Sequence, residues 1–537
     1  MRIQAAPTHD SCALVAELVL PLCILAIAAG GYWSTVPSRR IVGYFVLGAC
    51  VVCGMAVWRK LCRKNAEEKF YLRIVPLTVV VLACASSLFF PIATVPDEGR
   101  HYVIAYQMSS LVSGQGQFES RKTDHDFIVS ETTNGSAFRN SRILGGEVTA
   151  DRWKVLQDLF TWTAEEGGNQ ILSDEAFGTP AASSLLPQCR WAVVAGILLG
   201  RVLGLSGMAT FYLARLMNIL YVSALLGVAL KIMPAWKNVV TAVALLPMTL
   251  FLTGSCSYDG PIIGMACVLL ALILKCLYSE ERVDKGAVAA MLTVSALLAP
   301  CKIVYSLMAF GMYLIPAERF QSRRLGLALK ISIPAAVVLV LLLTQGQNLM
   351  RIFTTPDPGT LNVRMGTQEA PGCFVSSSEI LLHPAESVAM LARTMVLQAD
   401  MLLRSMVGTQ LGNLQANLIG PDVITTSFVC MLLMAILASG DDSEVLPARS
   451  RLWLAMLCLV MFLGIFVGIW VSWTYTTDTI ISGLQGRYFL PFLPCLMVAL
   501  RGGSVAARGS LRTLVVVALT SLDCILLMFM TIQVLAA

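Results

Sequence analysis

The feature that most constrains this chain is a series of apolar stretches long enough to cross a lipid bilayer. A membrane-spanning helix needs about 17–25 predominantly apolar residues. Ten stretches approach that length: 11–33, 41–58, 74–94, 210–230, 238–254, 260–278, 325–344, 421–438, 452–473 and 513–535. Three shorter stretches, 287–300, 303–316 and 488–500, are expected to cross as short or bent helices. The sequence therefore predicts an all-α integral membrane protein with about 13 transmembrane helices.

The composition agrees with a membrane protein. Hydrophobic residues make up 56% of the 537 residues and charged residues 13%, whereas a soluble domain carries about 25% charged residues. The 16 cysteines lie mostly inside apolar stretches and show no metal-ligand spacing. Only Cys189 and Cys373 fall deep in the long loops that are expected outside the cytoplasm. A disulfide between these two residues is possible. The chain has no nucleotide-binding glycine loop, and no nucleic-acid partner is expected.

Basic residues in the short loops set the expected orientation, because Lys and Arg favour the cytoplasmic side of a membrane. The strongest group lies between the second and third spans and comprises Arg59, Lys60, Arg63, Lys64, Lys69 and Arg73. With this group in the cytoplasm, the basic residues of the later short loops fall there too, and only Arg39 and Arg40 disagree. We expect the N-terminus inside and the C-terminus outside. The stretch 11–33 is interpreted as a retained span, with a signal peptide as the alternative.

This orientation divides the chain into five segments. They are N-terminal spans at 1–94, an external loop at 95–209, a central bundle at 210–344, a second external loop at 345–420 and C-terminal spans at 421–537. The apolar stretch 191–205 is expected to pack at the outer interface, because counting it as a span would reverse the basic loops that follow. A helix near 385–411 is expected at the end of the second external loop.

An acidic motif stands where the third span meets the first external loop. It contains Asp97, Glu98 and His101, directly after Pro96. Charges beside hydrocarbon cost free energy and usually mark a functional site. Asp97 and His101 are four residues apart and share one face of a helix, where one is suited to act as a base while the other orients a substrate. The alternative is that both carboxylates only favour a helix N-terminus.

A second carboxylate, Asp259, lies between two spans on the same expected side. It is either a helix-starting acid in a tight hairpin or the partner of Asp97 across the outer surface. Two such carboxylates are suited to hold a divalent cation, Mg²⁺ or Mn²⁺, or to position a sugar hydroxyl.

Cationic side chains occur at the same expected face. They are Arg215, Lys302 with Tyr305, and Arg487 with Tyr488. Arginine presents a fork of donors that matches phosphate oxygens. The alternative reading is that these side chains snorkel to the interface or anchor helix ends there. Together, the acids and bases suit a lipid phosphate and a neutral polar acceptor, and they do not suit the repeated charge ring of an ion channel.

The spacing of these residues resembles a family of bacterial polytopic membrane proteins classed as a domain of unknown function and related to the GT-C glycosyltransferases. The matching pieces are Pro96-Asp97-Glu98 with His101, Tyr106-Gln107, Arg215 with Asn218, Pro247-Met248 before Ser257-Tyr258-Asp259, Lys302 with Tyr305, Gly408 with Leu411-Gly412, and Gly486-Arg487-Tyr488-Phe489 with Pro491. They extend from about 75 to 500 and so cover most of the chain.

The resemblance implies a GT-C-like fold and a glycosyltransferase at the outer face of the bacterial inner membrane. The donor would be a polyprenyl-phosphate sugar and the acceptor an envelope glycan, lipid or protein. Asp97 would be the catalytic base, Glu98 and His101 would assist it, and Asp259 would be the second acidic site. Lys302 and Arg487 would grip the donor phosphate. One departure is that two spans precede the one feeding the acidic loop, whereas many GT-C enzymes have that loop after the first span.

Two alternatives belong to other functional classes. A glycolipid transporter or flippase would have charged residues near the bilayer midplane and two related halves; here the acids lie at span ends and no internal duplication is seen. A non-catalytic scaffold of an envelope-assembly complex would tolerate replacement of the charged outer residues.

Overall fold

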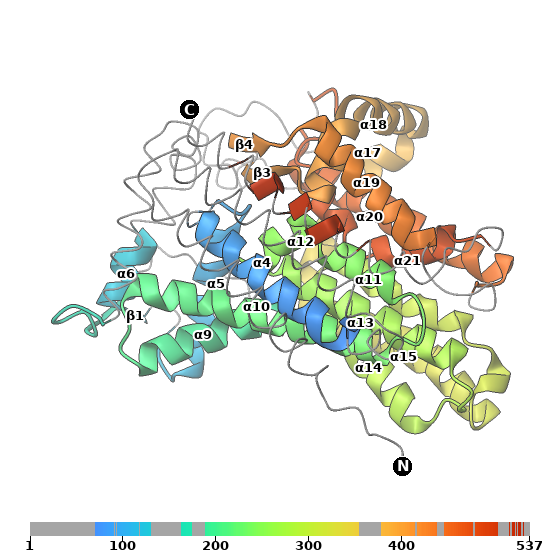
Figure 1. Ribbon diagram of the computed structural model, residues 1–537, viewed down its shortest axis with the longest axis horizontal. Helices are drawn as coiled ribbons and strands as arrows, with labels where there is room; N and C mark the ends of the chain where they lie inside the picture. The colour runs from blue at the N-terminus through green and yellow to red at the C-terminus, as the bar shows by residue number, and fades with distance from the viewer. Residues whose placement is uncertain are drawn as a thin grey trace, which may run out of the picture.

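A computed structural model describes residues 70–129, 163–173, 188–353, 377–437 and 445–502 and part of 515–530, with short gaps at 91, 93, 117–118, 414–415 and 476–477. Its regular structure is almost entirely helical (Figure 1). The described strands form two short antiparallel pairs, β1 (Glu119–Arg121) with β2 (Ile171–Ser173) and β3 (Gln410–Asn413) with β4 (Ala416–Ile419). The prediction of an all-α membrane protein is confirmed.

Five described helices are long and apolar enough to cross a membrane. They are Tyr71–Leu88, which joins η1 (Phe70–Ile74) to α4 (Val75–Phe89), α10 (Gly207–Ile232), α13 (Asp259–Tyr278), Arg323–Leu343 within α15 (Arg323–Phe353), and α20 (Ala448–Trp473). Shorter apolar helices are α14 (Lys285–Leu298), η6 (Ile303–Leu314) and α19 (Asp422–Leu437). Each of these eight helices falls on a predicted span.

Other predicted spans differ or fall outside the described residues. The stretch 238–254 forms two short helices, α11 (Lys237–Ala244) and α12 (Pro247–Thr253). Pro247 causes the break, because a proline disfavours helical backbone at the residue before it, and Leu246 is extended with φ −68° and ψ 137°. The stretch 488–500 contains η9 (Gly486–Phe489) and the eight-residue α21 (Leu493–Leu500).

The number of spans and the five segment boundaries remain predictions. Spans 11–33 and 41–58 and much of 513–535 lie outside the described residues.

Helix α13 lies at the centre of the bundle. It packs against α10, α14 and η6. In its most apolar 18-residue stretch, 89% of the residues are buried, compared with 22% in the corresponding stretch of α15. A helix that is apolar on all sides is stable only when neighbours surround it. Several leucines and valines of α15 are exposed, as expected for a helix that faces lipid. In Figure 1, α10, α13, α14 and α15 lie side by side in green and yellow.

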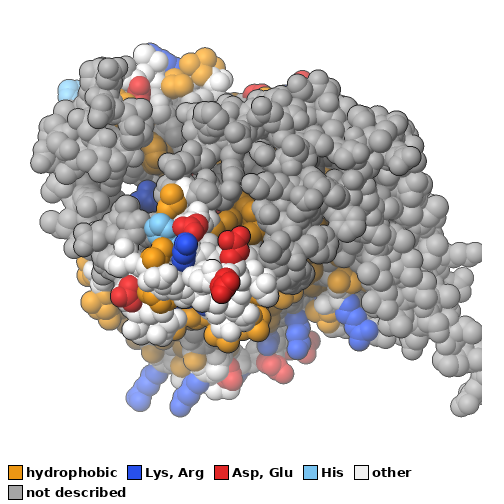
Figure 2. Space-filling model, turned by 90° about the vertical axis from the view of Figure 1, so that its left-hand side faces the viewer, with side chains coloured by type: hydrophobic (Ala, Val, Ile, Leu, Met, Phe, Trp, Pro, Cys, Tyr) orange, Lys and Arg blue, Asp and Glu red, His pale blue; other side chains and the backbone are white. Residues whose placement is uncertain are grey.

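The stretch predicted to pack at the outer interface forms α9 (Trp191–Val202), directly after the turn η5 (Gln188–Arg190). A helix of 12 residues is about 18 Å long, which is too short for a bilayer core of about 30 Å. It packs against α10 and α5 (Glu98–Val112). With α6 (Lys122–Ile128) these helices form one side of the molecule, and Figure 2 shows acidic, basic and histidine side chains gathered on that face.

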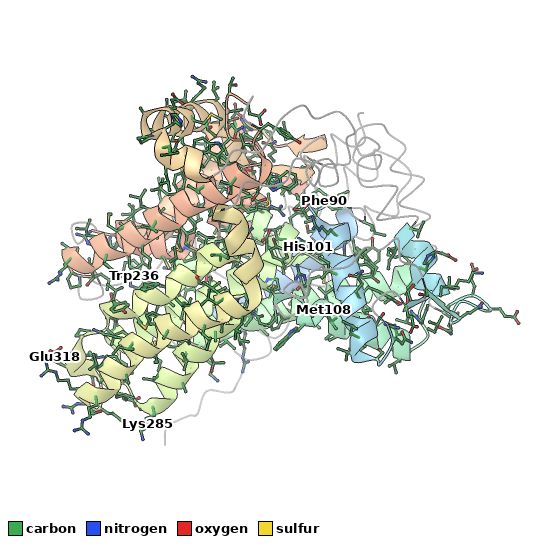
Figure 3. All side chains as sticks on the ribbon, turned by 180° about the vertical axis from the view of Figure 1, so that it is seen from behind. Phe90, His101, Met108, Trp236, Lys285 and Glu318 are labelled. Atoms are coloured by element: carbon green, nitrogen blue, oxygen red, sulfur yellow. The ribbon has the colours of Figure 1, made fainter. Side chains whose placement is uncertain are left out.

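The bundle has two ends of different character. Figure 3 shows Trp236, Lys285 and Glu318 at one end and Phe90 and His101 towards the other. The first end carries basic connections, including η7 (Ala317–Arg319). The other end receives α17 (Ser377–Leu382) and α18 (Pro384–Val407), which confirms the helix expected near 385–411.

The C-terminal part of α18 packs directly on η9. A Cβ atom on Gly486 would lie 2.0 Å from the carbonyl oxygen of Leu402 and 2.3 Å from the backbone nitrogen of Met406. The backbone N–H of Gly486 donates a hydrogen bond to Ser405 Oγ at 2.9 Å. Only glycine permits this approach, and it sets the position of the residue that follows, Arg487.

Candidate functional site

Asp97 occupies a strained backbone position at the start of α5. Its φ of 63° and ψ of 7° are left-handed, and α5 begins at the next residue. The helix therefore starts at Glu98, and Asp97 precedes its first turn. A left-handed conformation costs a non-glycine residue about 1–2 kcal/mol, and Asp and Asn tolerate it best. The N–H of His101 donates to the Asp97 carbonyl at 3.0 Å, so both residues belong to one turn.

Arg487 joins the two predicted carboxylates. Its Nη2 lies 2.9 Å from Asp97 Oδ2 and its Nη1 lies 3.1 Å from Asp259 Oδ2. Nη1 also donates to the carbonyl of Pro96 at 3.3 Å. Arg487 and Asp259 are buried, whereas the side chain of Asp97 is 51% exposed. The structure thus brings η9, the acidic motif and the start of α13 together through one guanidinium.

Lys302 extends this cluster. Its Nζ lies 3.7 Å from Asp259 Oδ1 and 4.0 Å from the centre of the Tyr488 ring. The hydroxyl of Tyr305 donates to the Tyr488 carbonyl at 2.8 Å. This bond holds η9, which carries Arg487 and Tyr488, against Tyr305. A cation over an aromatic face is stabilised by the ring quadrupole. The side chain of Lys302 is 26% exposed, and its ammonium lies within about 6 Å of the ring centres of Tyr258, Tyr305 and Tyr488.

Glu98 and Arg215 form a separate, closed ion pair. Nε and Nη2 of Arg215 each lie 2.8 Å from one oxygen of Glu98, and both side chains are almost completely buried. Glu98 also accepts the N–H of Cys256 at 2.9 Å, and Arg215 donates to the carbonyl of Ser87 at 2.7 Å. From the sequence, Glu98 is expected to assist catalysis and Arg215 to bind phosphate. In the structure, the ion pair instead attaches the acidic motif to α10. The carboxylate of Glu98 and the guanidinium of Arg215 bind each other and nearby backbone groups.

Asn218, one turn further along α10, positions the hairpin before Asp259. Its Nδ2 donates to the carbonyls of Ser255 and Ser257 at 2.7 and 3.3 Å. The hydroxyl of Ser257 accepts the N–H of Asp259 at 3.2 Å. Arg215 and Asn218 therefore place the two carboxylates, Asp97 and Asp259, relative to one helix.

His101 packs against Tyr258, and Arg190, which was not among the candidate residues, lies over the same ring. Its ring lies 4.1 Å from that of Tyr258, and the guanidinium of Arg190 lies 5.3 Å from the same Tyr258 ring. Burial lowers the pKa of His101 well below its ordinary value, and the cations Arg190, Arg487 and Lys302 lower it further. The imidazole is therefore neutral at pH 7, and its buried Nδ1 has no hydrogen-bond partner. The signal for Arg190 was a lone cation directly before an apolar helix.

The donor set does not fit the divalent cation expected between Asp97 and Asp259. The guanidinium of Arg487 already lies between the two carboxylates, and Lys302 contacts Asp259. A divalent cation would have to displace or oppose both positive charges. Among the described residues, no group of three or more His, Cys, Asp or Glu side chains could hold a metal ion.

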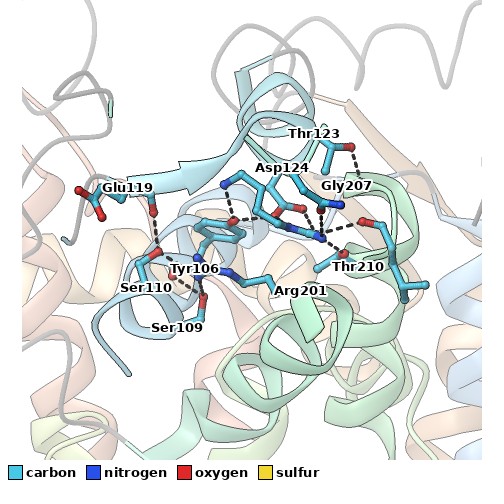
Figure 4. Close-up of polar contacts among 12 residues, drawn as sticks. Tyr106, Ser109, Ser110, Glu119, Thr123, Asp124, Arg201, Gly207 and Thr210 are labelled. Carbon is cyan, nitrogen blue, oxygen red and sulfur yellow. Dashed lines mark hydrogen bonds and ion pairs between the residues drawn. The ribbon is translucent and has the colours of Figure 1, made fainter. Parts of the chain in front are cut away.

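A second buried network holds α5 and α6 to α9 and α10 (Figure 4). Arg121 binds Asp124 through two contacts of 2.7 and 2.9 Å, and the hydroxyl of Tyr106 donates to Asp124 at 2.5 Å. Arg121 also donates to Thr210 of α10 at 3.2 Å, and Arg201 of α9 donates to Ser109 at 2.9 Å. These contacts fix α5 beyond the acidic motif, so His101 and Asp97 stand on a rigid support.

The chain belongs to the DUF2142 family, described as predicted membrane proteins, whose family model matches residues 80–496. The match includes every residue of the charged cluster. No curated protein and no solved structure matches the chain.

Proposed function

We propose that this member of the DUF2142 family is a membrane glycosyltransferase related to the GT-C enzymes, which transfers a sugar from a polyprenyl-phosphate donor to a cell-envelope acceptor. The observation that carries the proposal is the cluster at one end of the bundle. There, Arg487 contacts the half-exposed carboxylate of Asp97 and the buried carboxylate of Asp259, and Lys302 contacts Asp259. An anion-binding pair next to an accessible base is what sugar transfer from a lipid phosphate requires.

Each group has a role that follows from its contacts. Asp97 accepts the proton of the acceptor hydroxyl through the part of its carboxylate that faces solvent. Arg487 and Lys302 bind the donor phosphate and stabilise the negative charge that develops on it as the glycosidic bond breaks. Asp259 holds both cations in position. His101 remains neutral and adds no positive charge that would repel Arg487 and Lys302.

The bacterial inner membrane is the proposed location, with the cluster on its outer side. Lys285 and the loop of Glu318 lie at the end of the bundle away from His101 (Figure 3). Arg282, Arg319, Arg323 and Arg324 belong to the same short connections. The preference of basic loops for the cytoplasm supports an outward-facing cluster.

The test is a transfer assay with purified protein in lipid. Radiolabelled polyprenyl-phosphate sugars are supplied with envelope acceptors, and both labelled acceptor and released polyprenyl phosphate are measured. Wild type is compared with Asp97→Asn and with Asp400→Asn, which removes an exposed carboxylate on α18 outside the cluster. We expect sugar transfer by the wild type and by Asp400→Asn, and no transfer by Asp97→Asn. Equal turnover by Asp97→Asn would refute the role of Asp97.

A glycolipid carrier or an assembly scaffold would give a different pattern in the same assay. Saturable donor binding without turnover favours the carrier. Absence of both binding and turnover, with a folded protein, favours the scaffold.

A further inference from the structure

Two cysteines meet beside the candidate site, although they are far apart in sequence. Cys189 lies in η5 and is 1% exposed. Cys301 lies in the connection between α14 and η6. Their side chains are within hydrogen-bond range of each other. Both cysteines are free thiols in the structure, and a disulfide would bring their sulfur atoms to about 2.05 Å.

Gln188 holds the pair in place. Its Nε2 donates to the carbonyl of Leu297 at 2.6 Å and contacts Cys301 Sγ at 3.2 Å. The thiol of Cys301 donates to the same carbonyl at 3.3 Å. The residue directly before Cys189 is thus docked on the turn of α14 that leads to Cys301, which limits the relative movement of the two thiols.

Each cysteine directly precedes a cation of the site. Arg190 follows Cys189 and lies over the Tyr258 ring, and Lys302 follows Cys301 and contacts Asp259. A covalent bond between the cysteines would fix the backbone from which both cations extend. The bond would therefore preserve the spacing of the cations without occupying the site.

We propose that Cys189 and Cys301 are joined by a disulfide in the mature protein, which ties η5 to the connection between α14 and η6. This inference rests on the proposed placement of the cluster outside the cytoplasm, because disulfides persist in oxidising compartments. In the reaction, the two thiols lose two protons and two electrons. The oxidant is a disulfide of an external thiol oxidoreductase, which is reduced to two thiols as the Cys189–Cys301 bond forms. Cys373, the partner considered from sequence, lies outside the described residues.

The first experiment maps the cysteines of the full-length protein as it is made in cells. Thiols are trapped by acid quenching and alkylation in denaturant, and peptides are analysed with and without prior reduction. We expect a peptide linked through Cys189 and Cys301 that disappears on reduction. Cys267 and Cys458, buried in α13 and α20, serve as internal controls and should be alkylated without reduction. Alkylation of Cys189 and Cys301 without reduction, or a link from either to another cysteine, overturns the proposal.

The second experiment measures thermal unfolding of the purified protein with and without a reductant. Reduction should lower the unfolding temperature of wild type and of Cys267→Ser, but it should leave that of Cys301→Ser unchanged. An equal effect on all three proteins contradicts the proposed bond. Neither experiment uses sugar transfer, so a failed disulfide and a failed glycosyltransferase assignment are distinguished.

Discussion

Arg487 and Asp97 lie 390 residues apart in the chain, yet Nη2 of the arginine contacts Oδ2 of the aspartate at 2.9 Å. The same guanidinium contacts Asp259 at 3.1 Å. Three segments that begin or end at one side of the bundle are therefore connected by a single side chain, and the properties of the cluster depend on all of them.

The first prediction separates the carboxylate of Asp97 from its backbone strain. Asp97→Asn should abolish sugar transfer while the protein remains folded, because asparagine also tolerates a φ of 63°. Asp97→Ala should abolish transfer and also reduce the free energy of unfolding by about 1 kcal/mol, since alanine does not tolerate that conformation. Transfer and thermal unfolding are measured on the same preparations. An unfolding temperature of Asp97→Asn below that of Asp97→Ala would contradict the role given to the left-handed backbone of Asp97.

The second prediction concerns the fork of Arg487. Arg487→Lys retains the positive charge but cannot contact both carboxylates at once. A lost charge-assisted hydrogen bond amounts to about 1.5–3 kcal/mol, so the KM for the donor should rise about tenfold or more. Arg404→Lys, on α18 and outside the cluster, is the matched control and should leave KM near that of wild type. A similar rise in both variants would indicate general damage.

The third prediction concerns the buried pair of Glu98 and Arg215. Glu98→Gln should lower the free energy of unfolding by about 3–5 kcal/mol, because it leaves a buried guanidinium without its counter-charge. The double change Glu98→Leu with Arg215→Met should be less damaging than Glu98→Gln alone. Asp400→Asn at an exposed pair should cost at most about 1 kcal/mol. Additive losses in the double variant would count against a coupled pair.

The fourth prediction concerns the close approach of α18 to η9. Gly486→Ala should displace Arg487 and abolish transfer, because the new Cβ would lie 2.0 Å from the Leu402 carbonyl oxygen. Gly468→Ala is the matched control, since a Cβ at that position in α20 meets no atom within 4 Å. It should stabilise the protein by about 0.5–1 kcal/mol, as alanine is the better helix former. Transfer and unfolding temperature distinguish the two substitutions.

The fifth prediction follows from the lowered pKa of His101. Above pH 6.5 the imidazole is neutral in both the folded and unfolded states, so it does not make stability depend on pH. Below pH 6.5 the unfolded state binds a proton that the folded state excludes. Stability should therefore fall as the pH decreases, by up to about 1.4 kcal/mol per pH unit.

His101→Phe keeps a ring against Tyr258 and removes the titrating group. Its unfolding temperature should therefore depend less on pH between 6.5 and 5 than that of wild type. His383→Gln, at a side chain that is 59% exposed, is the control. Identical pH profiles for wild type and His101→Phe would contradict a buried neutral histidine.

Sequence reasoning located much of the cluster because charged residues are rare in this chain and occur at span ends. Asp97, Asp259, Lys302 and Arg487 stood out for that reason, and the structure brings them together. The same reasoning could not foresee how the charges pair. Glu98 follows Asp97 directly, yet the helix that begins between them turns the glutamate inward to Arg215 and leaves the aspartate half-exposed.

The sequence by itself determined that the chain is a helical membrane protein, because the length and apolarity of a span are local properties that the bilayer selects. It also predicted the position of eight of the described apolar helices. Only the tertiary structure decided which charges meet, that 238–254 breaks at Pro247, and that Arg190 joins the site through Tyr258. Those outcomes depend on the packing of helices far apart in sequence, where one close contact, such as that between Gly486 and α18, sets the position of a whole side chain.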